Sequence, residues 1–143
     1  MFHFLLYPFS LCYGIVMWIR KQCYNWRIFS IKNAEMPVIS LGNLSTGGTG
    51  KTPLAIWLIE KLLQNTLSPA YLSRGYGRKS QGYLRITSAH SPKESGDEAL
   101  LIARKFPELI TAVCEKRAEG AAQIRQNTET KVLVLDDAFQ HLA

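Results

Sequence analysis

The sequence predicts an α/β fold, a parallel sheet flanked by helices. Three observations predict this class. Short apolar runs alternate with longer stretches of helical pattern, the order that builds a parallel sheet. A glycine-rich segment separates the first apolar run from the first helical stretch. The composition of the 143 residues, 47% hydrophobic and 20% charged, is close to that of globular proteins and argues against a disordered chain, a collagen-like repeat and a coiled coil.

An apolar segment precedes this domain. Residues 2–19 contain no charged side chain, and Arg20 and Lys21 follow at once. This length lies at the lower edge of what spans a bilayer, and the many aromatic residues suit the interface, so we expect a membrane-associated helix lying in the interface. Residues 1–32 carry +4 of the net charge of +6, which would strengthen attachment to anionic headgroups. The alternatives are a helix that spans the membrane and a core helix that covers one side of the sheet.

The domain over residues 33–143 contains the alternating pattern. Its apolar runs predict strands over 37–41, 70–73, 111–114 and 131–135, and an alternating run over 83–87 predicts a fifth strand that pairs at an edge. Its helical patterns predict helices over 50–64, 97–106 and 117–126. Residues 74–96 are rich in Gly, Ser, Lys and Arg, and a connection this long inside a compact domain usually has a function.

The glycine-rich segment predicts a phosphate-binding loop of the P-loop NTPase type, because it lies between an apolar strand and an amphipathic helix. Its glycines let successive N–H groups point toward one phosphate, Lys51 would reach the β and γ oxygens, and the Thr52 hydroxyl would complete the coordination of Mg²⁺. The match to GxxxxGK[ST] departs at its first position, where Ser45 replaces glycine. We expect nucleotide to bind at Ser45, Thr46, Gly47, Gly48, Thr49, Gly50, Lys51 and Thr52.

Two aspartates, Asp136 and Asp137, directly follow the last predicted strand. The carboxyl end of a strand next to the P-loop strand is where such domains place the carboxylate that serves Mg²⁺. We expect Asp136 to be this metal ligand, directly or through water. The alternative is an acidic turn at the end of a strand.

The ordered set of motifs resembles the tetraacyldisaccharide 4'-kinase family, which phosphorylates the lipid A disaccharide precursor at the cytoplasmic face of Gram-negative inner membranes. The resemblance covers nearly the whole chain. After the apolar N-terminal helix, it includes Gly42-Asn43 leading into GGTGKTP at 47–53, LSRGYGRK at 72–79, GDEALL at 96–101 and DDAFQH at 136–141. It implies ATP and Mg²⁺ as cofactors and transfer of the γ-phosphate to the 4'-hydroxyl of a tetraacyldisaccharide 1-phosphate.

The resemblance also implies residue roles. Lys51 and Thr52 bind nucleotide and Mg²⁺, Asp97 activates the acceptor hydroxyl and Asp136 serves the metal. Asp137, Gln140 and His141 belong to the surroundings of the active site. Family members continue into a C-terminal domain with further catalytic residues, so we expect residues 33–143 to be a truncated P-loop nucleotide-binding domain. The family's usual glycine after the paired aspartates is Ala138 here.

Simpler interpretations of two of these features remain open. Ser95 and Glu98 form the S-x-x-E pattern of a capping box, so Asp97 could stabilise only a helix N-terminus. Arg74 and Arg78 fall in a stretch without acidic residues, so they either form a solvated basic loop or meet the lipid phosphate or the anionic membrane surface.

Two other functions compete with the kinase. One is a membrane-associated regulatory P-loop ATPase, although such loops carry a signature lysine where this chain has Thr46. The other is an inactive nucleotide-binding fragment. We expect no nucleic-acid partner, since no recognised nucleic-acid module accompanies the positive charge, and we infer no protein partner.

Overall fold

The computed structural model describes residues 10–11, 13–19, 22–23, 26, 34–42 and 50–136, and the chain forms two units, residues 1–32 and 33–142. In the first unit, residues 10–11, 13–19 and 22–23 are helical, and the apolar side chains of Leu11, Tyr13 and Trp18 are exposed. None of the described helices is both long and apolar enough to cross a bilayer. The predicted interfacial helix over 2–19 lies partly outside the described residues, and its attachment to a membrane stays a prediction.

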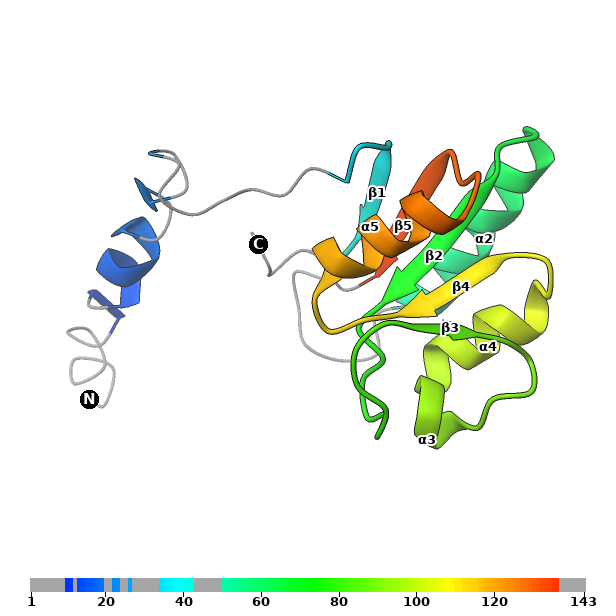
Figure 1. Ribbon diagram of the computed structural model, residues 1–143. Coiled ribbons are helices and arrows are strands. Elements are labelled where there is room, and N and C mark those ends of the chain that lie inside the picture. The colour runs from blue at the N-terminus through cyan, green and yellow to red at the C-terminus, as the bar shows by residue number, and fades with distance from the viewer. Residues whose placement is uncertain are drawn as a thin grey trace. The chain divides into compact units, whose positions relative to one another are not determined.

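The second unit contains a five-stranded sheet with helices on both faces (Figure 1). The strands lie in the order β1-β5-β2-β4-β3, and all neighbours are parallel except β3 and β4, which are antiparallel. In chain order the elements are β1 (Val38–Leu41), α2 (Lys51–Gln64), β2 (Pro69–Ser73), β3 (Leu84–Ile86), α3 (Pro92–Ser95), α4 (Asp97–Lys105), β4 (Ile110–Val113), α5 (Arg117–Asn127) and β5 (Val132–Asp136).

Two apolar cores hold the helices to the sheet. On one face, α2 and α4 bury Ile59 and Ile102 against Tyr71 and Val134 of the central strands. On the other face, α5 packs its buried side chains, Ile124 among them, against the apolar residues of the sheet (Figure 1). Because β2 and β5 are covered on both sides, their sequences are continuous apolar runs rather than alternating ones.

The predicted α/β class is confirmed in its coarse form, a mostly parallel sheet flanked by helices. Each predicted strand and helix is present within one or two residues of its expected bounds, and the 83–87 run forms the antiparallel edge strand β3. The predicted loop over 74–96 is less irregular than expected, since it contains β3 and the short helix α3. The Ser91 hydroxyl and the Glu94 carboxylate form a capping box at the start of α3.

Candidate active site

The carboxyl edge of the sheet brings together residues that the sequence predicts to bind nucleotide and metal. Leu41, the last residue of β1, pairs with Asp136, the last residue of β5. α2 begins at Lys51, packs against β2 and β5, and places Lys51 and Thr52, both half-buried, in its first turn. The N-terminus of this helix carries the positive end of the helix dipole, which favours binding of anions. This edge can therefore hold a phosphate chain and a cation.

Asp136 is a buried carboxylate, with only 2% of its surface exposed. The hydroxyl of Tyr71, which is fully buried, donates a hydrogen bond of 2.6 Å to Asp136 Oδ2. Burial, together with the negative charges of Asp136 and Glu98, raises the pKa of Tyr71 well above its ordinary value of 10.0. The phenol therefore keeps its proton and acts as a donor to the carboxylate.

The donor set at this edge fits Mg²⁺. This ion prefers oxygen ligands and is usually bound by one or two carboxylates together with phosphate oxygens and water. The Asp136 carboxylate and the Thr52 hydroxyl are such oxygens, at the end of β5 and in the first turn of α2. Neither cysteine thiolate nor imidazole is needed to complete a site of this kind.

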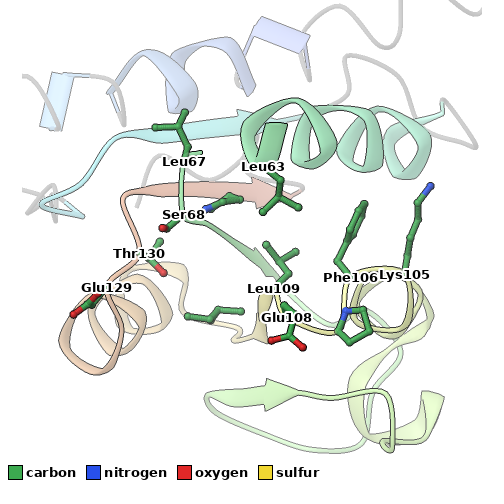
Figure 2. A pocket seen from close by; sticks show the side chains of 12 residues that line it. Leu63, Leu67, Ser68, Lys105, Phe106, Glu108, Leu109, Glu129 and Thr130 are labelled. Carbon is green, nitrogen blue, oxygen red and sulfur yellow. The ribbon is translucent and has the colours of Figure 1, made fainter. Parts of the chain in front are cut away.

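A groove of about 540 Å³ lies at the opposite edge of the sheet (Figure 2). Its walls come from the end of α2 at Leu63, the start of β2 at Pro69, the end of α4 at Phe106 and the start of β4 at Ile110. Ligands of open α/β sheets bind at the carboxyl ends of the strands. The groove is therefore separate from the candidate site at Asp136.

Asp97 is exposed and is the first residue of α4. The predicted capping box of Ser95 and Glu98 is wrong, because the N-cap of α4 is Gly96 and no side-chain cap hydrogen bond forms there. The Ser95 hydroxyl is instead directed to the preceding helix, where it donates to the Ser91 carbonyl at 2.8 Å. The dipole half of that interpretation still holds, since Asp97 lies in the first turn of the helix.

The segment after β2 packs closely against the start of α4. Gly96 has a φ of 78°, and a Cβ built there would lie 3.0 Å from the carbonyl oxygen of Tyr76. Only glycine combines this backbone angle with such a close contact at low cost. α4 covers the face of the sheet that carries Tyr71 and Val134, and Asp136, two residues after Val134, projects from this same face.

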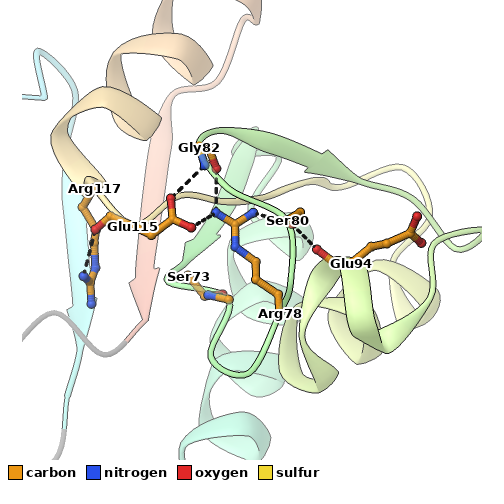
Figure 3. Close-up of polar contacts among 8 residues, drawn as sticks. Ser73, Arg78, Ser80, Gly82, Glu94, Glu115 and Arg117 are labelled. Carbon is orange, nitrogen blue, oxygen red and sulfur yellow. Dashed lines mark hydrogen bonds and ion pairs between the residues drawn. The ribbon is translucent and has the colours of Figure 1, made fainter.

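Arg78 makes contacts within the protein (Figure 3). Its side chain is only 2% exposed, and its Nη2 forms an ion pair of 2.5 Å with Glu115. The guanidinium also donates to the Gly82 carbonyl at 2.6 Å and to the Ser80 hydroxyl at 3.0 Å, while Glu115 Oε2 accepts a hydrogen bond of 2.9 Å from the Gly82 N–H. We call this set of contacts the Arg78–Glu115 link. It fastens the segment after β2 to the connection between β4 and α5.

Glu115 is held in its charged form by the same contacts. Partial desolvation would raise the pKa of its carboxyl, but hydrogen bonds from its own backbone N–H, from Arg78 and from Gly82 outweigh that and lower the pKa from its ordinary value of 4.5. Direct contact of Arg78 with a substrate stays a prediction and would require the link to open. Arg74, which is exposed, has no such restriction.

Comparison with known proteins decides the family. A family model described as Tetraacyldisaccharide-1-P 4'-kinase matches residues 2–143. The chain belongs to the tetraacyldisaccharide-1-P 4'-kinase family. The tetraacyldisaccharide 4'-kinase of Bacteroides thetaiotaomicron is 44% identical over an alignment of 141 residues that covers 97% of this chain and 37% of that protein. The kinase of Parabacteroides distasonis is 41% identical over an alignment of 143 residues that covers 98% of this chain and 38% of that protein.

A solved structure agrees with this family. LpxK from Aquifex aeolicus, crystallised in complex with ATP, matches with a TM-score of 0.80 and 36% identity, over 99% of this chain and 45% of that chain. The chain therefore spans less than half the length of the kinases it matches. Membership of the kinase family favours the kinase interpretation over the regulatory ATPase.

Some predicted site residues of this family member can be placed and others cannot. Gly50, Lys51, Thr52, Arg74, Arg78, Asp97 and Asp136 are in the part of the chain that the structure describes. Ser45, Thr46, Gly47, Gly48, Thr49, Asp137, Gln140 and His141 lie outside the described residues. Their predicted roles stay predictions.

Two residues of the site region were missed from the sequence. Tyr71 lies in the apolar run PAYLS, and this pattern predicts an apolar core residue. Only its hydroxyl indicates that a hydrogen-bond partner is needed. Glu115 follows the 111–114 strand as a single acid in a surface connection. Their partners lie 65 and 37 residues away along the chain, so local pattern could not find either pair.

Proposed function

We propose that this chain carries the nucleotide-binding part of a tetraacyldisaccharide 4'-kinase, which transfers the γ-phosphate of ATP to the 4'-hydroxyl of a tetraacyldisaccharide 1-phosphate, the lipid A precursor. Its family membership supports this reaction. The observation that carries it is the pairing of Asp136 with Leu41 at the carboxyl edge, where the glycine-rich segment leaves β1 and α2 begins at Lys51. A buried carboxylate beside a phosphate-binding helix N-terminus is the arrangement that phosphoryl transfer from a nucleotide requires.

The residues at this edge would divide the nucleotide chemistry between them. Lys51 would bind the β and γ oxygens and offset the negative charge that builds up on them during transfer. Thr52 and Asp136 would hold Mg²⁺, and this ion would supply positive charge that offsets the charge of the phosphates. We expect the backbone N–H groups of 45–50 to surround the phosphates, as in other P-loops.

Asp97 would act on the acceptor. An exposed carboxylate at a helix N-terminus on the same side of the sheet as Asp136 has the access that a lipid substrate needs. It would accept the proton of the 4'-hydroxyl as that oxygen bonds to the γ-phosphorus, while the bond from the γ-phosphorus to the β–γ bridging oxygen breaks and ADP leaves. Arg74, and Arg78 once released from Glu115, would contact the phosphate of the lipid, while Asp137, Gln140 and His141 would line the site.

The N-terminal unit would attach the kinase to the cytoplasmic face of the inner membrane, where its lipid substrate lies. Exposed apolar side chains at Leu11 and Trp18, followed by basic residues, support an interfacial helix. The full chain should bind anionic vesicles, and a 33–143 chain should not. Equal binding of both to vesicles would contradict this attachment.

The nucleotide site is tested by calorimetric titration of the full chain with ATP in the presence of Mg²⁺. Lys51→Ala should weaken binding about 10-fold or more, the scale of one charge-assisted hydrogen bond. Lys61→Ala, which removes an exposed lysine from the last turn of the same helix, should leave the affinity unchanged. Equal affinities for the Lys51→Ala and Lys61→Ala chains would rule out the proposed site.

A further inference from the structure

Tyr71 is a tyrosine in a place where an aliphatic or phenylalanine side chain would serve packing equally well. It lies in the middle of the central strand β2 and contributes to the core that α2 and α4 cover. Its surface is fully buried. Burial of a hydroxyl costs free energy unless a partner accepts its hydrogen bond, so this residue is favourable only because its tip has a specific contact.

That contact is Asp136, and the strand register creates it. Tyr71 pairs with Val134 of β5, and because side chains alternate along a strand, Asp136 projects from the same face two residues further on. The tyrosine side chain is long enough to reach across these two residues, and its hydroxyl lies 2.6 Å from Asp136 Oδ2. Both side chains are buried, so this hydrogen bond constrains the orientation of the Asp136 carboxylate.

We propose that Tyr71 is a positioning residue for the metal-binding carboxylate of Asp136, and that it thereby sets the affinity of the chain for the complex of ATP with Mg²⁺. The inference rests on the proposed function, which makes Asp136 a metal ligand. Hydrogen-bond partners of ligating carboxylates orient them, and removing such a partner typically weakens metal affinity or activity by 10- to 100-fold. Tyr71 itself contacts neither nucleotide nor lipid in this assignment.

The test separates the metal-dependent part of nucleotide binding from the rest. ATP is titrated into the full chain by calorimetry, once with EDTA and once with Mg²⁺, and the ratio of the two dissociation constants gives the gain that the metal provides. Tyr71→Phe removes only the hydroxyl and should reduce this gain by about 10-fold. Its ATP affinity in EDTA should equal that of the unsubstituted chain, because Lys51 and the helix N-terminus are unchanged.

The matched control is Tyr83→Phe. Tyr83 is partly buried and packs against the core on the other face of the sheet. This variant should keep the full metal-dependent gain. A second variant guards against loss of folding: 4-aminophenylalanine at position 71 keeps a donor at the same place as the hydroxyl and should retain the gain, and its loss would overturn the inference.

Three further results would also overturn it, and they are distinguishable. If Tyr71→Phe keeps the full gain, Tyr71 does not position Asp136 and the proposed function is unaffected. If Tyr71→Phe weakens ATP binding equally with and without Mg²⁺, the residue acts only through the fold. If the unsubstituted chain shows no metal-dependent gain, the role of Asp136 as a metal ligand fails, and that part of the proposed function fails with it.

Discussion

The Arg78–Glu115 link should make a measurable contribution to the stability of the α/β unit. We consider Arg78→Met, Glu115→Gln and the double substitution. Exposed ion pairs contribute about 0.2–1 kcal/mol, whereas breaking a buried pair costs about 3–5 kcal/mol. The side chain of Arg78 is 2% exposed and that of Glu115 is 41% exposed, so we expect a coupling free energy between these limits, about 1–2 kcal/mol.

The assay is a double-mutant cycle on the free energy of unfolding, measured by urea denaturation of the full chain. Arg78→Met alone should cost about 2–3 kcal/mol, because it also loses the bonds to Gly82 and Ser80, and it should lower the melting temperature by about 10 °C. The matched control is the exposed ion pair of Lys116 with Glu119, whose coupling should be smaller because solvent screens it. A coupling for Arg78 with Glu115 no larger than that of the control would show that the link stabilises no more than an exposed ion pair does.

Three other predictions concern the Glu115 carboxylate, Gly96 and the capping box of α3. Because the pKa of Glu115 is lowered in the folded state, its stabilising effect is fully present above its ordinary pKa of 4.5 and is lost as pH falls through the lower folded value. The difference in unfolding free energy between the unsubstituted chain and Glu115→Gln should therefore shrink only in that acidic range. A difference that stays constant down to full protonation would contradict this expectation. In thermal unfolding, Gly96→Ala should destabilise the chain by about 1 kcal/mol or more beyond the effect of Gly77→Ala. Both glycines have positive φ, but of the two only Gly96 has a backbone carbonyl 3.0 Å from the added Cβ. Glu94→Gln should lower helix stability at pH 7 by weakening the capping box at Ser91, and it should have no effect below the lowered pKa of Glu94, as monitored by circular dichroism of the full chain over a pH series.

Much of the fold could be predicted because its signals are local. Val132–Asp136 is an apolar run that ends in an acid, and Lys51–Gln64 has helical spacing directly after glycines, so both were predicted within one residue of their observed bounds. The helix α3 was not predicted, because four residues are too few to show a periodicity. The capping box was assigned to Ser95 rather than Ser91, since both serines precede a glutamate by three residues and sequence spacing alone does not distinguish them.

The candidate site could be predicted only in part, for a related reason. Lys51 begins a helix and Asp136 ends a strand, and in a parallel sheet the carboxyl ends of the strands form one edge, so the location of both residues can be predicted from sequence. The contacts that orient these ends depend on register across strands. Tyr71 meets Asp136 because Tyr71 pairs with Val134, and that pairing is fixed by the whole sheet. The sequence predicts that Arg78 faces solvent or substrate, but its side chain is buried and paired with Glu115 from the connection between β4 and α5.

The proposed kinase function requires that this chain supply both the nucleotide-binding residues and the residue that activates the acceptor. A chimera tests this requirement: the chain replaces the matching part of the Parabacteroides distasonis kinase, and transfer of labelled γ-phosphate from ATP to tetraacyldisaccharide 1-phosphate is measured. We expect transfer, a loss of about 100-fold or more with Asp97→Asn, and no loss with Glu108→Gln at the opposite edge of the sheet. A folded chimera that binds ATP but transfers no phosphate, or one in which Asp97→Asn is as active as Glu108→Gln, would contradict it.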